Sequence, residues 1–216
     1  MTSAPFPAIA AAIVLVVCAS GAHAGPVPLF DGKTFEGWQG DTRTTWRIED
    51  GMIVAGSHDK PAARNEFLST TRRFGNFDLR LKFKITGDKN INAGVQFRTE
   101  RIPDHHEVIG YQADIGPGYH GALYDESRRR TILAKPDKET TDKALAAVGE
   151  DGWNSYRILA SGGHIQLWLN GVKTVDYEEK DPGIAPDGVI AVQIHGGMQA
   201  VIAYKDITIE ELPAGP

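Results

Sequence analysis

The chain has 216 residues, with 23 Lys and Arg against 28 Asp and Glu, which gives a formal net charge of −5. This mild acidity argues against nucleic acid and anionic membrane surfaces as partners, because both attract basic proteins. The one cysteine, Cys18, lies in the N-terminal segment, so the remainder of the chain has neither a disulfide nor a thiol nucleophile.

Residues 1–24 have the features of a cleavable signal peptide. An apolar run from Ala8 to Ala19 is followed by Ala22-His23-Ala24, which matches the small-residue cleavage site of exported proteins. The run is too short to span a bilayer, and the bulky residue before Cys18 disfavours a lipid anchor. The sequence therefore predicts a periplasmic or secreted protein that is not inserted in the membrane after cleavage. Residues 25–216 are expected to form a single domain.

Short strands alternate with turns along the rest of the chain. Asp50-Gly51 predicts a hairpin between residues 46–49 and 52–55. Phe77 to Ile85 alternates apolar and polar side chains without interruption, which indicates a half-buried antiparallel strand. Further strands are predicted at residues 153–159, 164–169, 172–177, 188–195 and 199–212.

The region from residue 90 to residue 125 contains three more strand-like runs, with unusual polar side chains. Along two of them, and along residues 188–195, six hydrogen-bonding side chains alternate with apolar ones: Gln96, Arg98, Gln112, Asp114, Gln193 and His195. Successive side chains of a strand point to opposite faces, so these six are expected to share one face of a sheet. The pattern favours a site for a hydroxyl-rich ligand, and a structural network of buried polar groups is the alternative.

Single residues of this set also have structural interpretations that involve no ligand. His195 is a candidate general base because its reference pKa lies near neutrality, and a structural histidine is the alternative. Arg98 is also expected as an ion-pair partner of Asp114. Three aromatic residues are available to stack on a sugar ring: Tyr124, Trp153 and Trp168.

Other polar residues are weaker candidates. His105-His106-Glu107 resembles a metal-binding cluster in composition but lacks the spacing of known metal motifs, so a solvated loop is expected. His120 and Lys135 are minor candidates. Residues 135–152 are interpreted as a surface excursion with a short helix at residues 139–148, and a lid over the site is the alternative.

Taken together, the short strands and the Gly- and Asp-rich turns predict an all-β sandwich of two antiparallel sheets with at most one short helix. The sequence has no Glu-x-Asp-x-(x)-Glu run that would place two carboxylates on one strand, as a conventional glycosidase mechanism of such sandwiches requires. It also has no G-x-S-x-G, phosphate-binding loop or zinc motif.

Several motifs, in order, resemble those of one family. They are Leu29-Phe30-Asp31-Gly32-Lys33 with Gly37-Trp38, residues 92–98, 110–114, 121–124, 153–157, 169–171, 188–196 and 204–209. Over about residues 28–212 the chain resembles the bacterial 3-keto-disaccharide hydrolase family, formerly a domain of unknown function. The resemblance implies a concanavalin A-like jelly-roll fold.

The resemblance also implies a reaction. A ketone at C3 of a glycoside acidifies the C2 proton, so that a base removes it while the C1 oxygen leaves, with elimination or net hydrolysis as the outcome. His195 or Asp114 is expected as the base, with Arg98 and Gln112 as binders of the enolate and hydroxyl groups and Tyr124 as an acid.

The remaining expected contacts to the substrate come from Gln96, Gln193, Trp153 and Lys135. No cofactor is certain, and a divalent metal is left open, as is the oligomeric state. The expected ligand is a small carbohydrate. A non-catalytic carbohydrate-binding β-sandwich module is the alternative function.

Overall fold

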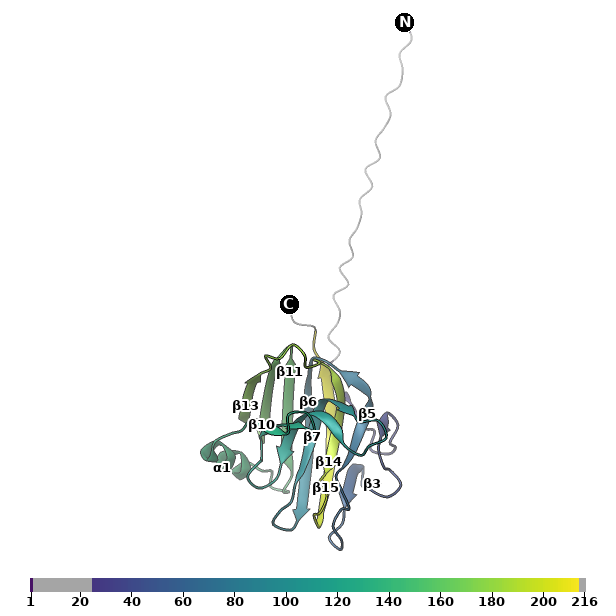
Figure 1. Cartoon of the computed structure of the whole chain (residues 1–216), viewed down its shortest axis with the longest axis vertical. Coiled ribbons are helices and arrows are strands. Elements are labelled where there is room, and N and C mark those ends of the chain that lie inside the picture. Colours follow the sequence, from purple (N-terminus) through teal and green to yellow (C-terminus); the bar gives the residue numbers. More distant parts are fainter. Residues whose placement is uncertain (2–24, 214–216) are drawn as a thin grey trace.

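The computed structural model describes Met1 and residues 25–213, so the predicted signal peptide lies outside the described residues. Two antiparallel sheets pack face to face, as expected (Figure 1). No helix among the described residues combines the length and the apolar character needed to cross a membrane.

The first sheet, here called sheet A, has eight strands. In spatial order they are β13 (Val172–Glu178), β12 (His164–Leu169), β11 (Asn154–Ser161), β6 (Phe77–Gly87), β15 (Ala200–Glu211), β4 (Met52–Gly56) and β3 (Trp46–Glu49), with β1 (Val27–Pro28) paired to β15.

The second sheet, sheet B, has seven strands. Their order is β10 (Thr131–Ala134), β9 (Leu123–Glu126), β8 (Val108–Ile115), β7 (Ala93–Arg101), β14 (Gly188–Ile194), β5 (Glu66–Phe74) and β2 (Trp38–Gln39). Neighbours in this order are far apart in sequence, as in β7 beside β14, so residues from distant segments meet on one face.

The core lies between the two sheets and follows the predicted alternation. In β6, Phe77, Leu79 and Phe83 are fully buried. Burying one such side chain stabilises the fold by about 1.5–3 kcal/mol. Aromatic rings also meet within the core: Phe97 stacks on Tyr111 with ring centroids 5.6 Å apart.

The hairpin predicted at Asp50-Gly51 is confirmed. These two residues have φ angles of 48° and 76°, and β3 pairs with β4 directly across them. A two-residue hairpin turn of this kind needs positive φ at both positions, which Asp and Gly tolerate. Asn170-Gly171 makes the same turn, with φ angles of 52° and 79°.

The predicted helix is present as α1 (Lys138–Ala146), at the edge of sheet A beside β13 (Figure 1). Asp137 caps it by accepting a hydrogen bond from the Thr140 amide at 2.8 Å. A lid formed by this segment finds no support, because no residue from 135 to 152 lines the cavity described below.

The sequence pattern does not predict strand β5. Phe67 and Leu68 are adjacent, yet both are fully buried, so the strand does not show the alternation of a half-solvated sheet. Leu68 belongs to the core, whereas Phe67 pairs with Gln193 on the outer face of sheet B, the face turned away from sheet A. This outer face is therefore itself partly covered.

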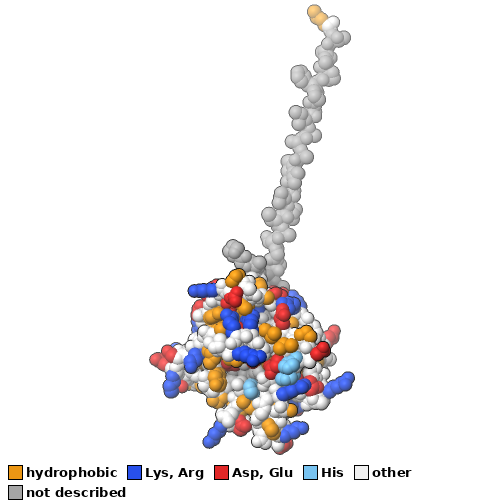
Figure 2. Space-filling view, in the orientation of Figure 1, with side chains coloured by type: hydrophobic (Ala, Val, Ile, Leu, Met, Phe, Trp, Pro, Cys, Tyr) orange, Lys and Arg blue, Asp and Glu red, His pale blue; other side chains and the backbone are white. Residues whose placement is uncertain are grey.

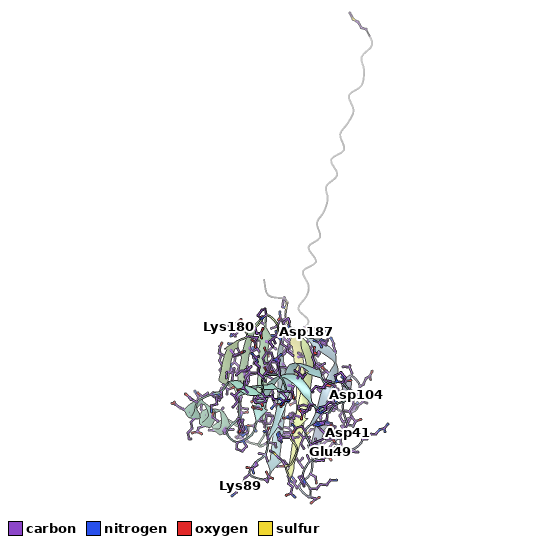
Figure 3. All side chains as sticks on the ribbon, in the orientation of Figure 1. Asp41, Glu49, Lys89, Asp104, Lys180 and Asp187 are labelled. Atoms are coloured by element: carbon purple, nitrogen blue, oxygen red, sulfur yellow. The ribbon has the colours of Figure 1, made fainter. Side chains whose placement is uncertain are left out.

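The cover is the end of the β7–β8 hairpin, which bends over the outer face of sheet B. The register of β7 against β8 shifts between Phe97 and Glu100, and Arg98 within this bulge has a φ angle of 45°. Beyond the bulge, Arg101 donates to the Phe67 carbonyl at 3.2 Å and Asn65 donates to Glu107 at 3.0 Å. Figure 3 labels Asp104 at the hairpin loop, on the same side of the molecule as Asp41.

A buried ion-pair network joins the two sheets. Asp125 in β9 is fully buried and accepts hydrogen bonds from Arg128 at 2.9 Å and from Arg129. Arg129 also contacts Glu179, which follows β13 in sheet A, at 2.5 Å. Removing one partner from such a network leaves buried charge without compensation.

We therefore expect Asp125→Ala to lower the free energy of unfolding by about 2 kcal/mol. This is less than the cost of breaking a fully buried ion pair, because both arginines are partly solvated. Urea unfolding measures this change. The matched control is Lys138→Ala, which removes an exposed pair with Asp142 and should cost about 0.5 kcal/mol or less. Equal effects of the two substitutions would contradict the proposed strength of the network.

Candidate active site

A cavity of about 260 Å³ opens on the outer face of sheet B. Its lining is almost entirely polar and consists of Asn65, Asn92, Gln112, Asp114, Tyr119, Tyr124, Glu126 and His195. This volume is below the range of about 300–1,000 Å³ typical of pockets for drug-sized ligands, which suits a ligand portion as small as one sugar ring.

Strand register explains why these residues meet. Gln112 in β8 lies directly opposite Tyr124 in β9, and Asp114 and Glu126 lie on the same face, two residues beyond this pair on opposite sides of it because the strands are antiparallel. His195 follows β14, and its amide hydrogen-bonds to the Asn92 carbonyl at 3.4 Å, which brings it to the end of β7.

Behind the cavity, a row of amide side chains crosses the strands. Gln96 donates to Gln112, and Gln112 donates to Asp114. Gly94 makes room for this row, because a Cβ atom there would lie 2.6 Å from the Gln112 side chain. Gln96 and Gln193 are fully buried, so the structure places them beneath the cavity wall instead of in its lining.

Asp114 is the most perturbed acid of the site. Burial raises the pKa of Asp114 to about 7, although the hydrogen bond from Gln112 acts in the opposite direction. Only 5% of the residue is exposed. A carboxyl group with a pKa near the working pH exchanges protons readily, which is the property of a general acid or base.

Glu126 is a second carboxyl group in the same cavity, and the sequence interpretation missed it. Burial, together with the nearby carboxylate of Glu107, raises the pKa of Glu126. The Glu-x-Asp-x-(x)-Glu motif, which this chain lacks, places both carboxylates on one strand, whereas Asp114 and Glu126 come from neighbouring strands. The available signal was the alternation itself, because Glu126 lies two residues after Tyr124 and must face the same way.

His195 and Tyr124 add a base and a donor. The Nδ1 atom of His195 lies 2.8 Å from the Gly196 carbonyl oxygen, which only accepts hydrogen bonds. Nδ1 therefore carries a proton, and Nε2 of the neutral ring is left as the acceptor. Burial and the neighbouring acids, first Glu126, raise the pKa of Tyr124, so its hydroxyl stays protonated as a donor.

Asn92 completes the lining with an unsatisfied group. Its side-chain Oδ1 is buried and has no hydrogen-bond partner among the described residues. Buried polar atoms without partners are uncommon in folded proteins and call for a reason. The side chains of Gln96 and Gln193 also have buried atoms without partners, so this feature alone does not indicate a ligand.

Arg98 does not share the face of Gln96, so that expectation is wrong. Its guanidinium donates to the carbonyls of Gly75 at 2.9 Å and Gly162 at 2.6 Å and to the Asn76 side chain at 3.2 Å. The expected ion pair with Asp114 is absent among these contacts. The cause is the bulge in β7, where the left-handed backbone of Arg98 interrupts the alternation.

Two other predicted binding residues also lie outside the cavity lining. Trp153 precedes β11 in sheet A, where the Lys205 ammonium sits 4.0 Å from its ring centroid. Lys135 follows β10 and does not line the cavity. The minor candidate His120 accepts a hydrogen bond from the Gly116 amide at 3.2 Å, which gives it a local structural role.

The described residues contain no group of three or more His, Cys, Asp or Glu arranged to hold a metal ion. His106 contacts the Asn65 carbonyl at 2.9 Å, and its ring stacks on that of His105 with centroids 4.4 Å apart. The contact of His106 ties the β7–β8 loop to the residue before β5. In the space-filling view, histidines gather with acidic and basic side chains on the front face (Figure 2).

Comparisons with known proteins agree on one family. A family model described as a 3-keto-alpha-glucoside-1,2-lyase-like domain matches residues 25–210. A protein of Bacteroides thetaiotaomicron named 3-keto-disaccharide hydrolase is 31% identical over 172 residues, which are 71% of this chain. The match spans only 58% of that relative's length.

Solved structures show the same fold. A putative glycosyl hydrolase from Parabacteroides distasonis has a TM-score of 0.63 at 21% identity, covering 88% of this chain and 95% of its own. The carbohydrate binding module CBM66 from Bacillus subtilis has a TM-score of 0.60 at 13% identity, covering 81% and 96%. The expected jelly-roll β-sandwich is confirmed.

The raised pKa of Asp114 makes stability depend on pH. Its unfolded carboxyl ionises near its ordinary value of 3.8, while the folded one stays protonated up to about 7. Asp114 therefore contributes stability that is fully present below about pH 4 and is lost as the pH rises through about 7.

We expect the difference in free energy of unfolding between the wild-type chain and Asp114→Asn to fall by about 1–4 kcal/mol across this window and to stay constant above it. Urea unfolding at a series of pH values measures the difference. The asparagine keeps the shape of the side chain and cannot titrate. A difference that does not change with pH would show that Asp114 ionises normally.

Proposed function

The chain belongs to the family of 3-keto-alpha-glucoside-1,2-lyase-like domains, and we propose that it cleaves glycosides whose sugar ring carries a ketone at C3. The observation that supports this most directly is the cavity in sheet B, where two carboxyl groups with raised pKa values, Asp114 and Glu126, lie with His195.

The reaction needs a base before anything else. A C3 ketone makes the C2 proton acidic, and its removal forms an enolate while the bond from C1 to the glycosidic oxygen breaks. Asp114 in its ionised form or Nε2 of His195 takes this proton. A pKa of about 7 leaves a large share of Asp114 ionised at neutral pH while keeping it basic.

The leaving oxygen needs a proton in the same step. Glu126 in its protonated form supplies it most readily, because its raised pKa increases the protonated share of this carboxyl group. Tyr124 is the weaker acid of the two, since its own pKa is raised. Water then adds to the unsaturated product if hydrolysis is the net outcome.

The developing enolate needs hydrogen-bond donors. The amides of Asn92 and Asn65 line the cavity and take the place first assigned to Arg98, whose donors are bonded elsewhere. Asn65 uses one of its two amide hydrogens on Glu107 and keeps the other for a ligand. Gln112 orients Asp114 and is itself held by Gln96. Such fixed donors lower the barrier because they need no rearrangement when charge develops.

Export is part of the proposal. It rests on the signal-peptide pattern of residues 1–24, and a periplasmic or secreted enzyme of this kind would act on glycosides outside the cytoplasm.

A carbohydrate-binding module is the second candidate function. It is favoured by the likeness in fold to the Bacillus subtilis binding module and by a polar cavity that would hold a sugar without any chemistry. The two functions differ in whether a group in the cavity moves a proton.

The deciding experiment uses residues 25–216 and follows glucose release from 3-keto-trehalose and, separately, from trehalose. Each reaction is run with and without EDTA. We expect release from the keto sugar alone. The EDTA arm reports whether a metal takes part. Saturable binding of the keto sugar without release would favour the binding module.

Site variants test the residues. Asp114→Asn and Glu126→Gln should each lower kcat by about 10²–10⁴-fold while sugar binding stays within about tenfold of wild type. Glu139→Gln in α1, an exposed position, is the matched control and should keep full activity. Wild-type turnover in both cavity variants would show that the cavity is not the active site.

A further inference from the structure

The outer face of sheet A, turned away from sheet B, carries the partly exposed tryptophans. Of the four tryptophans, Trp38 and Trp46 are buried at 7% and 2% exposure. Trp153 and Trp168 are only partly buried, and both stand beside basic residues of this face. The cavity described above has no tryptophan in its lining.

Two arginines on this face are held rigidly by one buried carboxylate. Asp78 in β6, 8% exposed at its side chain, accepts hydrogen bonds from Arg80 at 2.9 Å and from Arg157 at 2.8 Å. Arg80 and Arg157 lie directly opposite each other in the pairing of β6 with β11. Glu210 of β15 lies directly opposite Asp78 and is a second carboxylate near Arg80.

Trp168 lies on the next strand and fixes Arg157 further. The Arg157 guanidinium sits 4.4 Å from the Trp168 ring centroid, and the Lys173 ammonium sits 5.4 Å from it. Cation–π contacts of this kind hold an arginine over an aromatic plane. A side chain already ordered in the free protein loses less entropy when it binds a ligand.

These residues surround a hollow of about 400 Å³, lined among others by Arg80, Lys82, Ser155, Arg157, Trp168 and Asp206. Lys82 pairs with Asp206 at 3.0 Å. The three cations of the lining are matched by three carboxylates, Asp78, Asp206 and Glu210, and Lys205 opposite Lys82 adds one further positive charge. This local excess of positive charge contrasts with the net charge of −5 of the whole chain.

The face is long enough for a ligand of more than one ring. Lys205 stands over Trp153 and lies opposite Lys82, which borders the hollow. Trp153 is four residues from Arg157 along the β11 direction, which corresponds to about 13 Å at the rise of a strand. Trp168 thus lines the hollow, and Trp153 lies beyond it along β11.

We propose that the outer face of sheet A is a second binding site, for a carbohydrate that carries a carboxylate or sulfate group. Asp78 takes the Nε side of both guanidinium groups, and the hydrogens on their Nη1 side remain to bind either group. A partly exposed aromatic ring offers an apolar face with a polar edge to a sugar. A nucleic acid is a poor fit, because its binding requires many phosphate contacts and this chain is acidic overall. The two sites lie on opposite sheets, so a ligand on sheet A leaves the cavity in sheet B open.

The test uses the intrinsic fluorescence of the chain, whose partly exposed tryptophans belong to this face, and calorimetry. The chain is titrated with an oligogalacturonate, with a sulfated disaccharide, with neutral maltotriose and with a short single-stranded oligonucleotide. We expect a saturable change with at least one anionic sugar, none with maltotriose, and weaker binding as salt is raised. The anionic sugar that binds shows whether the site takes a carboxylate or a sulfate group.

Arg157→Gln should weaken this binding by about tenfold or more, and Lys82→Gln should weaken it as well. Lys82→Gln also guards against misfolding of the arginine variant, and thermal unfolding checks both. The control is Glu126→Gln in the other sheet, which should bind the anionic sugar as wild type does, whether or not the proposed enzymatic function is correct.

Three outcomes would overturn the proposal. The first is no binding of either anionic sugar at about 10 mM. The second is binding that survives both Arg157→Gln and Lys82→Gln, or binding that is lost in Glu126→Gln. The latter result would place the anionic sugar in the cavity of sheet B. The third is tighter binding of the oligonucleotide than of the sugars.

Discussion

Burying a carboxyl group on the outer face of a sheet is the constraint on which the candidate site depends. An ionised carboxylate is costly to remove from water, and Asp114 is nevertheless only 5% exposed. Its pKa rises as a result, and the same burial gives the cavity an acid that exchanges protons near neutral pH. The amide of Gln112 offsets part of the cost by donating to it.

The bent β7–β8 hairpin creates that burial. An outer face of an antiparallel sheet is normally solvated, but the bulge at Arg98 turns the hairpin end across β14 and onto β5. Gln96, Gln193 and Phe67 are fully buried beneath it. Arg98 then serves this architecture by bonding to the carbonyls of Gly75 and Gly162, which accounts for a buried arginine without assigning it a chemical step.

The sandwich also separates two polar surfaces that have different chemistry. Sheet B presents buried acids and amides in a small cavity, while sheet A presents ordered arginines and tryptophans on an open face. Jelly-roll sandwiches host both enzymes and binding modules, so fold alone does not decide function. The distinction rests on particular groups: titratable carboxyls in one place, preorganised cations in the other.

Local features of this protein could be predicted from its sequence. Alternation marked strands such as β6, Asp-Gly and Asn-Gly marked hairpins, and ordered motifs pointed to the family, because each depends on residues that are close in the chain. The sequence also brought Gln112, Asp114, Tyr124 and His195 forward as candidates. The packing of distant segments was needed to show that Glu126 joins Asp114, that Arg98 points away and that Trp153 lies beside the other sheet. Those facts depend on strand register, on a bulge and on which strands are neighbours, and hydrogen bonding between distant segments sets all three.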